Sequence, residues 1–144
     1  MGTRSLTRFI ETYKSTSTGR KRTNKIVTMY RQYDGYPTGH GLELAQFLAG
    51  GELVNGLGYD NPERVFNGMG CLTAQVVAHF KEGAGGIYLQ PNNSKDYEDY
   101  NYTVVGDFDT KELKIIVRHW DSKEKLFEGT PAEFLESELV KEEA

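Results

Sequence analysis

The chain has one cysteine, Cys71, among its 144 residues, so it cannot form an intrachain disulfide. It also lacks any apolar run near the roughly 20 residues that a membrane-spanning helix needs. No charged segment followed by an apolar one opens the sequence, so we expect no secretory signal peptide. Together these absences favour a protein of a reducing cytosol that has no membrane partner.

Signatures of catalysis are also scarce. The three histidines, His40, His79 and His119, lie far apart, and none has the HExxH spacing of a zinc peptidase. Cys71 falls in a predicted buried helix with no histidine beside it in sequence, so we expect it to pack. The run Gly83–Gly86 lacks the Lys-Ser/Thr pair of a phosphate-binding P-loop. The sequence therefore predicts a protein that is not an enzyme and that holds no metal or cofactor.

Charge is distributed unevenly along a chain whose formal net charge is −4. The span from Arg4 to Arg31 is strongly basic and has Glu11 as its one acid, whereas Glu133–Glu143 is acidic. An acidic total disfavours binding to a nucleic acid polymer, while a basic N-terminal part can face a small anionic ligand. The alternative for the basic run Gly19–Lys25 is an exposed hairpin loop.

Alternating and helical hydrophobic patterns predict one domain over residues 1–144. The expected strands are Ser5–Tyr13, Lys25–Tyr33, Ile87–Gln90, Tyr100–Phe108, Leu113–Trp120 and Lys123–Glu128. The expected helices are Gly41–Ala49, Gly70–Lys81, a single turn capped by Asn61, and a short C-terminal helix that begins at Thr130-Pro131-Ala132-Glu133. The predicted class is α+β, with an antiparallel sheet of about five to six strands and two main helices packed on one face.

The segment Met29–Gly41, MYRQYDGYPTGHG, is the most informative part of the sequence. It begins as a strand, its Asp-Gly and Pro-Thr-Gly steps are turn signals, and a helical pattern starts near His40. A strand–loop–helix junction of this kind gathers Arg31, Tyr36 and His40 near the free backbone N–H groups of a helix start, which suit an anion. The alternative is that the tyrosines only pack and the glycines only form turns.

Arginine, tyrosine and asparagine recur near predicted strand ends, as at Arg31, Tyr88, Asn92 and Arg118. Guanidinium groups bind phosphate oxygens, aromatic rings stack on bases, and asparagine contacts base edges. These residue types together indicate a nucleotide pocket, although packing at a rim would explain about half of them equally well.

Three segments, MGTRSLT, MYRQYDGYPTGHG and GCLTAQVVAHFKEGAGGIYLQP, resemble the Thoeris anti-defence protein one family of phage nucleotide sponges. The resemblance spans Met1 to about Pro91, and the second half matches in organisation more than in motif. Members of that family are non-catalytic, and they hold cyclic ADP-ribose variants made by bacterial TIR-domain proteins away from their effectors. Some also bind cyclic oligonucleotides of related defence systems, and they act as oligomers with pockets between subunits.

For this chain the resemblance implies a phage-encoded sponge in the cytoplasm of an infected bacterium, assembled as a homo-oligomer. It implies phosphate contacts by Arg31 and Arg118 and stacking of a base on Tyr88. Arg31 matches through its motif, whereas Tyr88, Arg64, Asn92 and Arg118 match by position and residue type.

Two alternatives remain open at this point. The first is a phosphodiesterase that degrades a cyclic nucleotide signal, which would normally need a metal cluster or a histidine pair to activate water. The second is a phage interaction protein without a ligand. If subunits assemble, we expect the hairpin Ser15–Asn24 and the aromatic segment Tyr97–Tyr102 to make the contacts.

Overall fold

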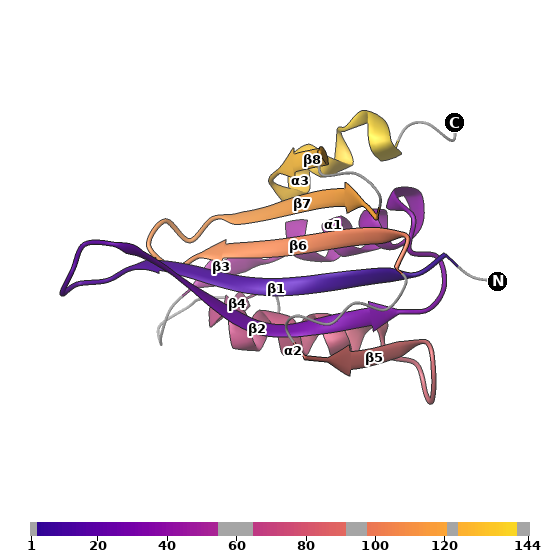
Figure 1. Cartoon of the computed structure of the whole chain (residues 1–144), viewed down its shortest axis with the longest axis horizontal. Helices are drawn as coiled ribbons and strands as arrows, with labels where there is room; N and C mark the ends of the chain where they lie inside the picture. Colours follow the sequence, from indigo (N-terminus) through magenta and orange to yellow (C-terminus); the bar gives the residue numbers. More distant parts are fainter. Residues whose placement is uncertain (1–2, 55–64, 92–97, 121–123, 141–144) are drawn as a thin grey trace.

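A computed structural model describes residues 3–54, 65–91, 98–120 and 124–140 and has an α+β fold (Figure 1). Its main sheet has six strands in the order β5-β2-β1-β6-β7-β8. The strands are β1 (Ser5–Lys14), β2 (Lys21–Arg31), β5 (Ile87–Gln90), β6 (Tyr100–Asp107), β7 (Leu113–His119) and β8 (Lys125–Gly129). Neighbouring strands are antiparallel except β1 and β6, which run parallel. The predicted fold class is confirmed, with one parallel pair in a sheet expected to be wholly antiparallel.

The two main helices, α1 (Leu42–Ala49) and α2 (Gly68–Phe80), lie behind the sheet in Figure 1 and cover one of its faces, as predicted. A π-helical turn, η1 (Pro37–Gly41), leads into α1. The segment between the two helices, expected to be irregular, contributes a parallel pair of short strands, β3 (Glu52–Val54) and β4 (Val65–Asn67). The helical turn predicted at Asn61 lies outside the described residues.

The core lies between the sheet and the two helices. Alternate strand residues and one stripe of each helix contribute its fully buried side chains, among them Phe9, Met29, Val104, Val117, Leu44, Leu48, Leu72 and Val76. Tyr102 of β6 is also fully buried, and its hydroxyl donates a 2.6 Å hydrogen bond to the carbonyl of Gly35. The expectation that Tyr102 faces another subunit is therefore wrong, because this side chain points into its own core; Tyr97 of the same segment lies outside the described residues.

The short C-terminal helix α3 (Pro131–Leu135) starts as the sequence predicts. The Thr130 side chain accepts from the Glu133 N–H, and the Glu133 side chain accepts from the Thr130 N–H, so the capping box is complete. Phe134 anchors this helix: it is fully buried and packs edge to face on Phe127, with ring centroids 5.0 Å apart. A 3₁₀ turn, η3 (Glu138–Val140), follows.

The hairpin of β1 and β2 projects beyond the rest of the sheet (Figure 1). Its last pair is Lys14 with Lys21, so most of the basic run Gly19–Lys25 belongs to β2 instead of the expected loop, although the run is exposed as expected. Lys21 Nζ lies 2.6 Å from Asp107 Oδ2, so the base of the hairpin is tied to the end of β6.

Candidate functional site

A hollow of about 360 Å³ opens at the end of β2, beside the end of α2. Its walls are Arg31, Tyr33, Asp34, Phe80, Glu82, Ala84, Gly85, Gly86 and Ile87. The loop between α2 and β5 forms one side, and its three glycines all have positive φ, from 65° to 80°, which favours glycine over other residues. This loop is held against β2 by a hydrogen bond from the Gln32 N–H to the Gly86 carbonyl, at 2.9 Å. The hollow is called the Arg31 hollow below.

The Arg31 side chain is held from three sides. Its Nη1 donates to His40 Nδ1 at 3.1 Å and lies 3.3 Å from Glu43 Oε2. Its guanidinium carbon is 5.2 Å from the centroid of the Phe80 ring, within the range of a cation–π contact. With 16% of the side chain exposed, Arg31 presents an oriented cation to the hollow.

His40 lies behind Arg31 and is fully buried, so the structure places it under the predicted site instead of at its surface. Its Nε2 is 2.7 Å from the Thr7 hydroxyl, and its ring packs against Tyr102 and Phe80 with centroids 4.9 and 5.2 Å away. A guanidinium can only donate, so Nδ1 must carry the lone pair and Nε2 the hydrogen, which the Thr7 oxygen accepts. Burial, with a smaller contribution from the Arg31 charge, lowers the His40 pKa to about 3, which keeps the ring neutral.

Because His40 is buried and neutral, we predict that the free energy of unfolding decreases in mild acid. The unfolded chain binds a proton at this histidine near pH 6.5, whereas the folded chain does so only near pH 3. Stability is therefore full above pH 6.5 and declines as the pH falls toward 3, by at most about 1.4 kcal/mol per pH unit. Urea unfolding between pH 7.5 and pH 5 should show a loss of about 1.5–2 kcal/mol below pH 6.5.

A His40→Asn variant is the control for this slope. It is expected to be less stable at every pH but to lose the decline between pH 6.5 and pH 5, since asparagine does not titrate. A wild-type free energy of unfolding that stays flat over this range would contradict the buried neutral histidine.

Tyr36 and the expected helix start do not form the predicted anion site. The Tyr36 hydroxyl donates to Asp34 Oδ1 at 3.1 Å, and this side chain does not line the Arg31 hollow. The N–H groups of Gly39, His40 and Leu42 all donate to backbone carbonyls, because the chain turns through η1 before α1 begins. Those three donors are satisfied internally, so the helix start is not the anion-binding element that the sequence suggested.

The opposite face of the sheet carries a row of side chains, one from each strand. Directly paired residues on neighbouring strands share a face, and here the pairs run through Tyr88, Tyr30, Leu6, Asn101, Arg118 and Lys125. Arg8 joins this face and donates from Nη1 to Asn101 Oδ1 at 2.6 Å. Arg8, Asn101 and Arg118 form a second cationic group, called the Arg118 group below.

The predicted site residues therefore fall in separate places. Tyr88 and Arg118 share a face, but buried Tyr30 and Leu6 lie between them in the row, so they do not meet within one chain. Tyr88 does not line the Arg31 hollow, but its hydroxyl lies beside Gly85 of the glycine loop, 3.7 Å from where a Cβ on that residue would stand.

Two predicted residues, Arg64 and Asn92, lie outside the described residues. The sequence also missed two parts of the hollow. Phe80 falls in the expected helix Gly70–Lys81 and was not assigned to a site, and Gly83–Gly86 was considered and excluded as a phosphate-binding loop. The one local signal for either was the glycine-rich run itself.

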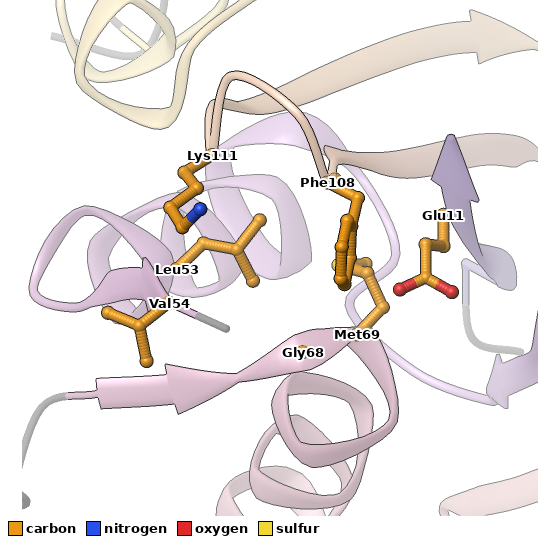
Figure 2. Close-up of a pocket in the computed structure, with 8 residues that line it drawn as sticks. Glu11, Leu53, Val54, Gly68, Met69, Phe108 and Lys111 are labelled. Carbon is orange, nitrogen blue, oxygen red and sulfur yellow. The ribbon is translucent and has the colours of Figure 1, made fainter. Parts of the chain in front are cut away.

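Two other cavities are poorer candidates. One of about 370 Å³ near α3 includes Lys21 and Lys114, but Lys21 is paired with Asp107 and Lys114 with Glu128, at 2.6 and 2.8 Å. The other, of about 10 Å³, is walled chiefly by apolar side chains and has Glu11 and Lys111 at its margins (Figure 2). That volume is at most the room one water needs. The Arg31 hollow is the better site for an anionic ligand.

Comparisons of the chain with protein-family models, with curated proteins and with solved structures find no match. Within the part of the chain that the structure describes, no three His, Cys, Asp or Glu side chains are grouped so as to hold a metal ion. In that same part, every helix is too short or too polar to cross a membrane.

Proposed function

We propose that this protein is a non-catalytic sponge that captures cyclic ADP-ribose-type signals and so blocks a bacterial anti-phage defence in the cytoplasm of the infected host. The single observation that supports it most is Arg31, which the resemblance assigns to phosphate and which lines a hollow of about 360 Å³. Hollows of this size lie within the usual range for small-molecule pockets.

The walls of the Arg31 hollow match the parts of such a ligand. A guanidinium pairs with a pyrophosphate through two parallel hydrogen bonds. Tyr33 is 54% exposed, so its ring is free to stack on a base. Asp34 and Glu82 would repel phosphates but accept hydrogen bonds from ribose hydroxyls. We therefore place the phosphates at Arg31 and the sugars toward the two carboxylates.

The proposal extends to a homo-oligomer with the ligand at a subunit boundary. The hollow is open to solvent, and the edge strand β5 beside it exposes Tyr88 and Leu89, at 47% and 56%. Exposed apolar side chains on an edge strand are typical of a surface that another chain covers. A second copy would also bring an Arg118 group toward a ligand that Arg31 of the first copy holds.

Light scattering tests this assembly. We expect a mass of at least twice the 16.3 kDa of one chain at micromolar concentration. A Leu89→Glu variant should shift the protein toward monomer, because it places a charge on the exposed edge. A monomeric mass with and without cyclic ADP-ribose would contradict the boundary pocket.

Capture and turnover are separated by recovering the ligand. The protein is incubated with excess cyclic ADP-ribose, freed of unbound ligand by gel filtration, and heat-denatured. The sponge proposal expects intact ligand in a fixed ratio to protein chains. Cleaved product that accumulates in the unbound fraction would indicate a phosphodiesterase, and the absence of both retained ligand and cleaved product would favour an interaction protein.

A further inference from the structure

We infer that His40 and Thr7 are positioning residues that orient the Arg31 guanidinium for an anion without neutralising its charge. This inference rests on the proposed function for its anion, but its geometry is carried by three described residues from different elements. Thr7 lies on β1, His40 on η1 and Arg31 on β2, and hydrogen bonds of 2.7 and 3.1 Å join them in that order.

Burying a histidine in a core costs more free energy than burying an apolar side chain of the same size. An unpaired polar group in a core is destabilising, so burial of His40 is tolerated only because both ring nitrogens have partners. An apolar side chain would fill the same volume between Tyr102 and Phe80 without that requirement. The polar ring therefore has a use beyond packing, and its second nitrogen faces Arg31.

The Thr7 hydroxyl determines the tautomer of His40, and so whether Nδ1 can accept a hydrogen bond from Arg31. By accepting from Nε2–H, it fixes the tautomer whose Nδ1 lone pair accepts from the guanidinium. The other tautomer would point an N–H at Arg31 and repel it. Thr7, on the central strand β1, thus determines whether Arg31 can donate a hydrogen bond to His40 at the wall of the Arg31 hollow.

A neutral acceptor orients a cation but leaves its charge available. The carboxylate of Glu43 would instead neutralise Arg31, yet that ion pair is long, at 3.3 Å, and the Glu43 side chain is 48% exposed. Exposed pairs of this kind contribute little. His40 and the Phe80 face therefore fix the orientation, and the positive charge remains for a ligand.

The test is a Thr7→Val variant, which keeps the shape of the side chain and removes the hydroxyl. Binding of cyclic ADP-ribose is expected to weaken by roughly two- to tenfold, the value of one neutral hydrogen bond. Thr7→Ser should restore it. Thr73→Val is the matched control, because it removes the hydroxyl of a buried threonine that does not line the Arg31 hollow, and it should bind as tightly as the wild type.

Nuclear magnetic resonance gives a readout that needs no ligand. The wild-type His40 ring should show a protonated Nε2 and an unprotonated Nδ1, and the Arg31 guanidinium protons should exchange slowly with water. Thr7→Val should lose the slow exchange, and Thr7→Ser should keep it. A wild-type ring with hydrogen on Nδ1, or slow Arg31 exchange that survives in Thr7→Val, would overturn the inference.

The two proposals fail differently. If the wild type binds no cyclic nucleotide, the proposed function fails, while the Arg31 exchange in the Thr7 variants still decides whether this side chain is oriented by His40. If the wild type binds and Thr7→Val binds equally well with unchanged Arg31 exchange, only the positioning role is lost.

Discussion

Arg31→Ala is expected to weaken binding of cyclic ADP-ribose by roughly tenfold to a hundredfold. Charge-assisted hydrogen bonds to phosphate contribute about 1.5–3 kcal/mol, and Arg31 lines the hollow with its guanidinium already oriented by His40 and Phe80. Arg31→Lys should recover part of the loss, because it restores the charge but not the planar fork. Calorimetry measures the affinity, and thermal melting shows whether each variant is folded.

The matched control is Arg22→Ala, on the exposed hairpin and away from the hollow. It removes the same charge and should leave the affinity unchanged. Arg118→Ala should also weaken binding, because the proposed boundary pocket includes the Arg118 group of a second copy. Normal affinity in a folded Arg31→Ala would remove this residue from the site.

Phe134→Ala is expected to lower the free energy of unfolding by about 3–5 kcal/mol, the usual cost of deleting a buried phenyl ring. Phe134 is fully buried, packs on Phe127, and lies close to Gly41, where a Cβ would come within 2.9 Å of its ring. Its loss would leave a cavity beneath the turn that carries His40. Urea unfolding measures the change.

Leu126→Ala is the control for this prediction, because Leu126 is 42% exposed on β8. It should change the free energy of unfolding by no more than about 0.5 kcal/mol. A loss below 1 kcal/mol in Phe134→Ala would show that α3 is not an integral part of the core.

Most helices and strands could be predicted, because the residues that specify each of them lie within or next to the element in the sequence. The start of α3 was predictable because its capping box lies within four consecutive residues. The parallel pairing of β1 with β6 was not, since strand alternation shows which face a residue takes but not which strand lies beside it. The β3–β4 pair was missed because each strand is three residues long and pairs across a long connection.

The candidate site shows the same difference between local sequence signals, which could be interpreted, and contacts between distant segments, which could not. Arg31 was predictable from its motif, but its supports were not. His40 follows two turn signals and was interpreted as a loop residue, and only the packing of Tyr102 and Phe80 buries it. The glycine loop becomes a wall of the hollow only because β5 pairs with β2, a contact between segments about 60 residues apart in sequence.

Mapping cyclic ADP-ribose on the protein by nuclear magnetic resonance tests directly whether the Arg31 hollow is the binding site. On titration with cyclic ADP-ribose, we expect the largest shifts at the backbone amides of Tyr33, Gly85 and Gly86 and at the Arg31 guanidinium. The hairpin tip near Gly19 should not shift and serves as the internal control. Saturable shifts confined to the Arg31 hollow and the subunit boundary beside it would support binding of the ligand at Arg31. Saturable shifts elsewhere that leave Arg31, Gly85 and Gly86 unmoved would contradict binding in this hollow.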